Sequence, residues 1–257
     1  MADVSTNRVV IQIRDLVKSF GDHRVLNGID LDAHRGETLV IIGRSGCGKS
    51  VLLKHIIGLL KPDEGTVAVE GHILSQLKPR DLYQVRLRFG IVFQNAALFD
   101  SLTVAGNVGL ALAEHSNKSK AEIADIVAHK LELMGMKGTE DMMPADLSGG
   151  MKKRVSLARA IAFDPDFVLF DEPTTGLDPI TADAINNLIV ELSDRLSVTS
   201  IAVTHEMKSA YKIADRIVML HDGRIIKSGT PDEIEHSDDP VIHQFIHGLA
   251  EGPLKAT

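Results

Sequence analysis

Several short segments of the chain are apolar at nearly every position and are bounded by turn residues. Continuous apolar runs of this length are typical of strands that are buried on both faces of a parallel sheet. They occupy residues 38–42, 89–93, 167–170 and 201–203. Because stretches with helical patterns separate them, they predict an α/β fold with a parallel core sheet.

Two further pairs of strands are predicted at the two ends of the chain. Residues 9–13 and 25–31 predict a small antiparallel sheet near the start. Near the end, residues 216–220 and 224–227 flank Asp222-Gly223, which is a typical hairpin turn.

The pattern changes between residues 96 and 163, where apolar residues recur at helical spacing. Ser119 and Glu122 form a capping box at the start of one helix, and Ser148 is placed to cap a second helix over residues 149–162. We predict a mostly helical insertion between sheet strands. Three basic residues of this insertion are expected on a solvated helix face: Lys152, Lys153 and Arg154.

The composition is that of an ordinary globular protein. The chain has 257 residues, of which 44% are hydrophobic and 25% charged. Its net charge of −7 argues against general nucleic-acid binding, which needs a basic surface. The sequence contains neither an apolar run long enough to span a membrane nor a signal-peptide pattern at its start. Its single cysteine, Cys47, excludes an internal disulfide and fits a reducing compartment.

The strand at 38–42 leads into a loop with the spacing G-x-x-x-x-G-K-S of a phosphate-binding loop. Its glycines let the backbone approach phosphate closely, and its amides form a concavity that suits an anion. A buried helix over residues 50–60 follows, so phosphate would lie at a helix N-terminus. Cys47 is either a small filler or a thiol activated by that terminus, and we favour the filler role. The predicted nucleotide-binding residues of this segment are Gly43, Arg44, Ser45, Gly46, Cys47, Gly48, Lys49, Ser50 and Val51.

Polar residues stand at the carboxyl ends of the other apolar strands, which is where open α/β sheets bind ligands. Asp171 and Glu172 follow one strand, Gln94 ends a second, and His205 follows a third. We expect Glu172 to be the general base for an attacking water, His205 to contact the γ-phosphate, and Lys49 to neutralise charge on the transferred group. Magnesium prefers oxygen ligands, and the candidates are Ser50, Gln94 and Asp171.

Residues 147–151, Leu-Ser-Gly-Gly-Met, resemble the LSGGQ signature of ATP-binding cassette (ABC) proteins, with Met151 in place of the usual glutamine. The other motifs of this family appear in its usual order. They are the phosphate-binding loop, Gln94, Asp171-Glu172, Gly176-Leu177-Asp178 and His205. The resemblance covers nearly the whole chain and implies an ATPase that binds ATP and Mg²⁺.

The resemblance also implies an architecture and a homodimer. The fold would be a P-loop NTPase with a RecA-like parallel core sheet, an N-terminal antiparallel β subdomain and an α-helical ABC subdomain. In the dimer, two ATP molecules would lie between subunits, where Ser148, Gly149 and Gly150 of one chain meet the nucleotide held by the other. Asp178 would lie at the seam. Phe20 stands where the family commonly has an adenine-stacking tyrosine, although residue type alone leaves a core role open.

A narrower resemblance concerns the transported substrate. Residues 93–99, Leu112-Ala113-Glu114-His115, Met151, residues 178–181 and residues 248–253 look like those of ATPases in the maintenance-of-lipid-asymmetry (Mla) and related Mce-type lipid transporters. This resemblance implies a peripheral ATPase on the cytoplasmic face of the inner membrane. Its partners would be MlaE-like permease subunits, a lipid-binding MCE-type subunit and a small accessory subunit, but no nucleic acid. The lipid substrate follows from the resemblance alone.

The expected domains follow from these motifs. Residues 1–95 and 164–236 would form the ATP-binding core with its antiparallel subdomain, and residues 96–163 the helical subdomain. Residues 237–257 would form a C-terminal extension, whose apolar stripe either docks on its own domain or contacts a partner or the dimer.

Three other functions share some of these features. An ATPase of another ABC importer, for example for amino acids, would have the same enzymology. A non-transport ABC protein usually has a coiled-coil insertion or two cassettes in one chain, and neither is present in the sequence. A P-loop kinase would need neither Ser148-Gly149-Gly150 nor a dimer.

Overall fold

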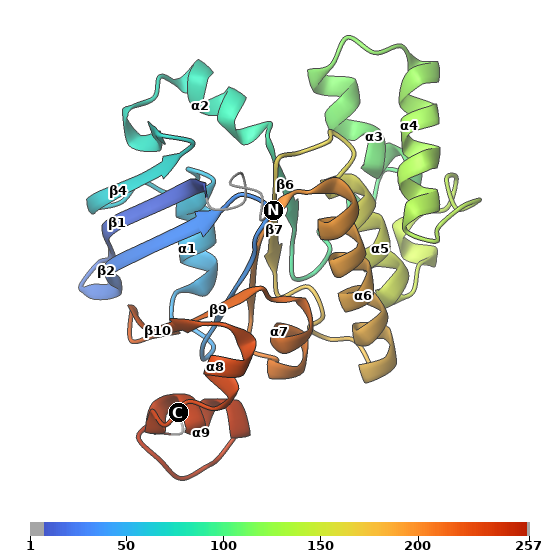
Figure 1. Ribbon diagram of the computed structural model, residues 1–257. Coiled ribbons are helices and arrows are strands. Elements are labelled where there is room, and N and C mark those ends of the chain that lie inside the picture. Colours follow the sequence, from blue (N-terminus) through green and yellow to red (C-terminus); the bar gives the residue numbers. More distant parts are fainter. Residues whose placement is uncertain (1–7, 256–257) are drawn as a thin grey trace, which may run out of the picture. The chain divides into compact units, whose positions relative to one another are not determined.

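A computed structural model describes residues 8–255 of the chain, which form two compact units (Figure 1). The first unit contains the residues up to Tyr83 and those from Ile201 onward, and the second contains Gln84–Ser200. The predicted helical insertion at 96–163 lies within the second unit, and its exact boundaries stay a prediction.

The first unit contains an antiparallel sheet with the strand order β2-β1-β4-β5 (Figure 1). Its strands are β1 (Val9–Phe20), β2 (His23–His34), β4 (Glu64–Val69) and β5 (His72–Ile73). The first two are longer than predicted because the tight turn at Gly21-Asp22 lets them pair along their whole length, from Val9 opposite His34 to Phe20 opposite His23. The predicted antiparallel sheet is confirmed.

The first unit also contains four strands in the order β10-β9-β3-β8. These are β3 (Thr38–Ile42), β8 (Thr199–Thr204, whose first two residues belong to the second unit), β9 (Arg216–His221) and β10 (Arg224–Gly229). Strand β3 runs parallel to β9 and is buried at every residue. The predicted hairpin joins β9 to β10, with positive φ angles of 45° at Asp222 and 71° at Gly223.

Helices and one short 3₁₀ segment connect or follow the strands of the first unit. They are α1 (Lys49–Ile56), the 3₁₀ segment η1 (Leu74–Gln76), α2 (Pro79–Arg86, which runs into the second unit), α7 (Met207–Ile213), α8 (Pro231–Glu235) and α9 (Pro240–His247). Helix α1 ends earlier than residue 60 because Gly58 adopts a left-handed φ of 72° and its amide donates to the carbonyl of His55. Helix α9 and the segment after it pack on this unit through buried Ile242 and Leu254.

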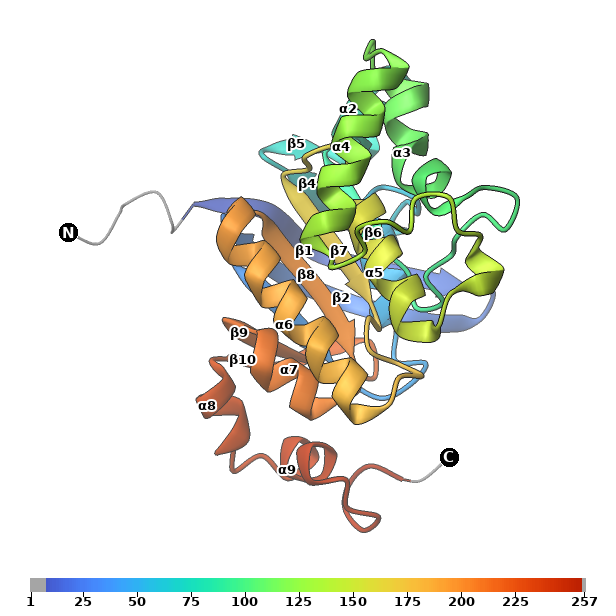
Figure 2. The same cartoon turned by 90° about the vertical axis from the view of Figure 1, so that its right-hand side faces the viewer.

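The second unit combines a parallel strand pair with a group of helices (Figure 2). Strand β6 (Phe89–Val92) runs parallel to β7 (Phe167–Asp171), and the rings of Phe89 and Phe167 stack with centroids 4.7 Å apart. The helices are α3 (Val104–His115), α4 (Lys120–Leu133), the 3₁₀ segment η2 (Pro144–Asp146), α5 (Gly149–Ala160) and α6 (Pro179–Leu196). Helices α3, α4 and α5 contact one another, which confirms a mostly helical segment. The predicted caps at Ser119 and Ser148 are both formed, and Asp178 caps α6.

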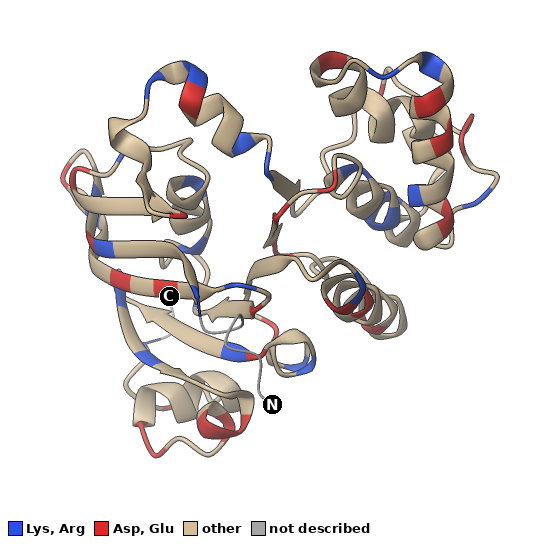
Figure 3. Cartoon of the chain, turned by 45° about the horizontal axis from the view of Figure 1, so that its top comes forward, with Lys and Arg blue, Asp and Glu red and all other residues tan. Residues whose placement is uncertain are grey.

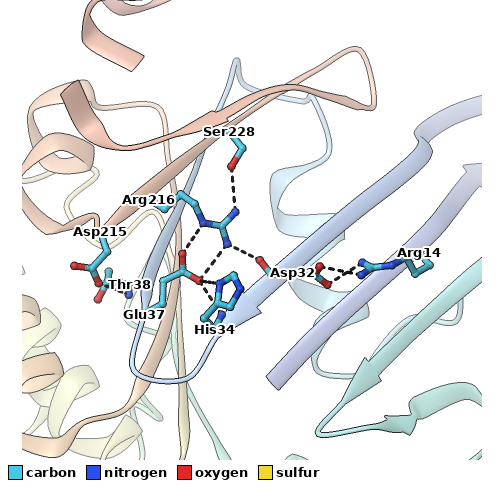
Figure 4. A network of polar contacts seen from close by, with 8 residues as sticks. All are labelled: Arg14, Asp32, His34, Glu37, Thr38, Asp215, Arg216 and Ser228. Atoms are coloured by element: carbon cyan, nitrogen blue, oxygen red, sulfur yellow. Dashed lines mark hydrogen bonds and ion pairs between the residues drawn. The ribbon is translucent and has the colours of Figure 1, made fainter. Parts of the chain in front are cut away.

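A polar network joins the antiparallel sheet of the first unit to β3 and β9 (Figure 4). The guanidinium of Arg216, at the start of β9, donates to both carboxylate oxygens of Glu37, at 2.6 and 3.1 Å, and to the carbonyl of Asp32 in β2 at 2.5 Å. The backbone amide of His34 donates to the same Glu37 carboxylate at 2.8 Å. Because such paired contacts fix direction as well as distance, they hold β2 against the start of β9.

The surface carries both signs of charge. Lys and Arg are interspersed with Asp and Glu over both units (Figure 3). None of the helices within residues 8–255 combines the length and the apolar character that a membrane span requires.

Candidate functional site

The phosphate-binding loop joins β3 to α1 in the first unit. Gly43, Gly46 and Gly48 have φ angles of 154°, 79° and 107°, which glycine adopts at little cost. A Cβ at Gly43 would lie 2.3 Å from the carbonyl oxygen of Leu220, whereas a Cβ at Gly46 would meet nothing within 4 Å. The loop is therefore packed tightly on β9 at one end and open at Gly46, which leaves room for a phosphate group.

The start of α1 is electrostatically suited to an anion. Gly48 is its N-cap, and neither a side-chain cap nor an acidic residue occupies its first turn. Amides at such a terminus carry partial positive charge. Lys49 is only 5% exposed, and its Nζ donates to the carbonyls of Gly43 at 2.7 Å and Arg44 at 3.0 Å. Its ammonium is thus held over the loop, within reach of the outer phosphates of a bound nucleotide.

The structure favours the filler role for Cys47. Burial raises the pKa of its thiol, and the nearby Lys49 ammonium offsets only part of this effect. A thiol with a raised pKa is mostly protonated near neutral pH and is a weak nucleophile.

Phe20 lies at the end of β1, and it is 49% exposed, which argues against a core role. The ammonium of Lys18 lies 5.6 Å from the centroid of the Phe20 ring and donates to the Asp63 carboxylate at 2.7 Å. The amide of Ser19 donates to the other oxygen of Asp63, also at 2.7 Å. These contacts hold the backbone beside Phe20 and place Lys18 over the ring, which is still half exposed and so can stack on a base with its other face.

In the second unit, Asp171 ends β7 and Glu172 follows it with a left-handed φ of 51°. This conformation is costly for a residue with a side chain and is often found at active sites. Glu172 is 9% exposed, and its carboxylate accepts a hydrogen bond from the Thr175 hydroxyl at 2.8 Å. The carboxylate therefore sits in a fixed, mostly buried position directly after a sheet strand.

The signature segment forms the N-terminus of α5. The hydroxyl of Ser148 accepts a hydrogen bond from the amide of Met151 at 3.3 Å, and no acidic residue lies in the first turn of α5. Ser148 and Gly149 are exposed, and Gly150 is half-buried. The exposed, uncharged N-terminus can thus receive an anion from outside the chain.

Asp178 caps α6 with its own carboxylate. It accepts hydrogen bonds from the amides of Ile180 at 3.0 Å and Thr181 at 3.1 Å, and from the Thr181 hydroxyl at 2.5 Å. The Thr181 hydroxyl, together with these amides, lowers the pKa of the Asp178 carboxyl. Its position is therefore set by the helix it begins.

Lys153 is the one clear error in the sequence expectations for this region. Its side chain was expected in solvent, but it is 4% exposed, and its Nζ donates to the carbonyl of Gln94 at 2.5 Å and to that of Glu172 at 3.3 Å. A signal was present in the sequence: Lys153 shares a helix face with Leu157 and Ala160, both of which are buried. The neighbours Lys152 and Arg154 are half-buried.

The predicted site residues divide between the two units. Phe20, residues 43–51 and the exposed His205 lie in the first. The second contains Gln94, Asp171, Glu172, Ser148, Gly149, Gly150 and Asp178. Their convergence on one nucleotide stays a prediction.

The donor set also fits a magnesium nucleotide. No three His, Cys, Asp or Glu side chains gather into a metal site among the residues that the structure describes. Magnesium in nucleotide sites usually takes one or two protein oxygens and completes its shell with phosphate and water. The hydroxyl of Ser50, the amide oxygen of Gln94 and the carboxylate of Asp171 are oxygen donors of this kind.

Comparisons with known proteins agree with this geometry. Residues 26–175 match the family model described as ABC transporter. The chain is 39% identical to an intermembrane phospholipid transport system ATP-binding protein, MlaF, of Haemophilus influenzae, covering 97% of this chain and 94% of that protein. It is also 39% identical to a probable ribonucleotide transport ATP-binding protein, mkl, of Mycobacterium leprae, covering 96% of this chain and 71% of that one.

Solved structures show the same fold. A dimeric ATP-binding cassette in a post-hydrolysis state with ADP and Pi is 30% identical to this chain, with a TM-score of 0.79 over 86% of this chain and 98% of that one. The predicted P-loop NTPase fold is thereby confirmed. With its phosphate-binding loop, signature helix and family match, the chain belongs to the ABC transporter family and is an ATPase of the ATP-binding cassette type.

Proposed function

We propose that this chain is the ATPase subunit of an ABC transporter that moves phospholipid between two membranes. The observation that carries the proposal is the match to the MlaF-named relative over nearly the full length of both chains. The match to the relative named for ribonucleotide transport has the same identity but covers less of that protein. The alternative of an amino-acid importer receives no support from these relatives.

The chemistry proposed for the site is hydrolysis of the γ-phosphate. Glu172 accepts a proton from the attacking water, and Lys49 and the α1 amides stabilise charge on the phosphates. His205 orients the water and the γ-phosphate, and Gln94 contributes to the same shell. The buried position and the Thr175 contact of Glu172 support its role, because a general base must be held in one place.

Magnesium is part of this proposal. Ser50, Gln94 and Asp171 would hold it directly or through water, where it would neutralise charge on the phosphate oxygens.

We further propose that two copies pair head to tail. The exposed Ser148 and Gly149 of one copy would meet the nucleotide on the loop of the other, and Asp178 would lie at the seam. Ile180, two residues after this aspartate, is the most exposed of the large apolar side chains among the described residues, at 84%. A partner subunit would cover it.

The membrane location belongs to the same proposal. The chain would lie on the cytoplasmic face of the inner membrane, bound to MlaE-like permease subunits, with an MCE-type lipid-binding subunit and a small accessory subunit in the complex. Residues 94–99 would bear on the permease, and Phe99 at the end of this stretch is 53% exposed.

The experiment is to purify the chain from membranes with its bound subunits and to place the complex in vesicles. We expect bound phospholipid and ATP-dependent transfer of labelled phospholipid, which the Glu172→Gln variant abolishes. ATP-dependent uptake of ribonucleotides or amino acids without phospholipid transfer would contradict the proposed substrate. Absence of any membrane partner would contradict the transporter role altogether.

A further inference from the structure

Helix α5 holds the backbone that follows both parallel strands of the second unit. Lys153 donates to the carbonyl of Gln94, which follows β6, and to that of Glu172, which follows β7. One turn and a half farther along, Arg159 donates to the carbonyls of Ala96 at 2.7 Å and Ala97 at 2.6 Å. Two cations of one helix thus bind four carbonyls in the two segments.

The segments they hold are strained. Ala96, Ala97 and Glu172 have φ angles of 58°, 48° and 51°, although none of them is a glycine. Residues other than glycine keep this left-handed backbone conformation only where the surrounding structure enforces it. The contacts from Lys153 and Arg159 supply that enforcement.

The position of α5 itself is closely fixed. A Cβ at Gly90 in β6 would lie 2.1 Å from the carbonyl oxygen of Ala160, so only glycine allows the helix this close to the strand. Lys153 is 4% exposed and Arg159 half-buried, and burial lowers the pKa of the Arg159 guanidinium. Buried cations are unfavourable unless they bind oxygen, so these side chains are committed to the carbonyls they meet.

From this arrangement we propose that Lys153 is a positioning residue for ATP hydrolysis: from the helix that Ser148 begins, it sets the backbone of Gln94 and Glu172. The inference rests on the proposed role of Glu172 as general base. The Lys153 ammonium touches no reacting atom. It acts through Gln94 and Glu172, whose carbonyls it binds. A helix that has received a nucleotide at Ser148 would thereby act directly on the placement of the base.

The test compares three variants of the full chain in its membrane complex. Lys153→Met keeps the length and apolar stem but removes the ammonium, Lys153→Arg keeps the charge, and Lys152→Met makes the same chemical change at the half-buried neighbour. We measure kcat, KM for ATP, ATP affinity and melting temperature for each.

We expect Lys153→Met to lower kcat by about 10²-fold, the cost of misplacing a catalytic group by about 1 Å. Its ATP affinity should stay within about 3-fold of the original, because phosphate binding does not depend on Glu172. Lys153→Arg should recover most of the rate, and Lys152→Met should match the parent protein. An unchanged kcat in Lys153→Met, or parallel losses of kcat, affinity and stability, would overturn the inference.

A second measurement keeps the inference testable if Lys153→Met does not fold. Lys153→Gln replaces the ammonium with a neutral amide on a stem too short to bind both carbonyls, so its kcat should also fall, and a parental kcat in this variant would refute the positioning role. In a Glu172→Gln background, either Lys153 variant should reduce kcat by less than about 3-fold further, because the positioned base is already gone. An undiminished further loss there would show that Lys153 acts elsewhere.

The two failures are distinguishable. If Glu172→Gln alone keeps full turnover, the proposed base is wrong. If it loses turnover while Lys153→Met does not, only the positioning role fails.

Discussion

The guanidinium of Arg44, inside the phosphate-binding loop, donates to the backbone carbonyl of Lys255 at 2.8 Å. The segment that ends at Lys255 is folded back on α9 by Gln244, which is 5% exposed. Its amide group donates to the carbonyls of Leu249 at 3.1 Å and Leu254 at 2.9 Å, and its oxygen accepts the amide of Leu254 at 2.6 Å. The C-terminal segment therefore docks on its own unit, next to the nucleotide loop. Contact with a partner subunit stays a prediction.

Gln244→Ala should release this segment without unfolding the rest. Three hydrogen bonds are lost, each worth about 1 kcal/mol, so amide exchange over residues 248–255 should accelerate by about 10²-fold. Hydrogen-exchange mass spectrometry measures this, with the exposed His243→Ala on the same helix as the matched control. Unaltered exchange in Gln244→Ala would mean that the side chain does not hold the segment.

Glu172→Gln should separate binding from turnover. The amide keeps the size of the side chain but cannot accept a proton, so kcat should fall by about 10²–10⁴-fold while ATP affinity survives. Phosphate release and equilibrium binding of ATP measure the two quantities. Thr175→Val, which removes the hydroxyl bound to this carboxylate, should give a smaller loss. Near-normal turnover in Glu172→Gln would remove this residue from the role of base.

Phe20→Ala should weaken ATP binding. Stacking of a base on an aromatic ring contributes about 1–3 kcal/mol, so the dissociation constant for ATP should rise by about 10-fold or more, with kcat at saturation little changed. Phe20→Tyr retains the ring face and serves as the control. Asp63→Asn, which weakens the hold on Lys18 and Ser19, should raise the constant to a lesser extent. An unchanged constant in Phe20→Ala would place adenine elsewhere.

Glu37 should make the protein sensitive to acid. Burial alone would raise the pKa of this carboxyl, but the hydrogen bonds and charges of Arg216 and His34 outweigh burial and lower the pKa below its ordinary value of 4.5. Because the folded-state pKa is the lower one, its stabilisation is complete above the unfolded pKa and is lost as pH falls through the folded pKa.

Glu37→Gln should therefore destabilise the protein by about 2 kcal/mol at pH 7 and flatten the decline of stability on acidification. Denaturant midpoints measured at intervals of pH test this, with the exposed Glu64→Gln as the control. If Glu37→Gln and the parent lose stability over the same acid range, then other carboxyls dominate.

The fold was predictable where the physical signal is local. Strands buried on both faces, such as Thr38–Ile42, and helix starts with a capping side chain, such as that at Asp178, depend on a few neighbouring residues. The helix ending at Ile56 was predicted too long, because Leu59 and Leu60 continue an apolar pattern past the residue where Gly58 stops the helix.

The candidate site was predictable as a set of motifs but not as a set of contacts. Lys153 was assigned to solvent because neighbouring charges usually mark an exposed helix face. Its real partners are backbone carbonyls at Gln94 and Glu172, and a carbonyl is present at every residue and leaves no mark in the sequence. For the same reason, the hydrogen bond from Arg44 to the carbonyl of Lys255 could not be predicted from the sequence.

The absence of a side chain at Gly90 has a mechanical consequence. Since a Cβ at this position would lie 2.1 Å from the carbonyl oxygen of Ala160, the glycine lets the signature helix pack directly on the backbone of β6. If nucleotide binding at Ser148 shifts this helix, its two cations would shift the backbone after both strands with it. A glycine far from any phosphate would thus set how faithfully the force of nucleotide binding is transmitted.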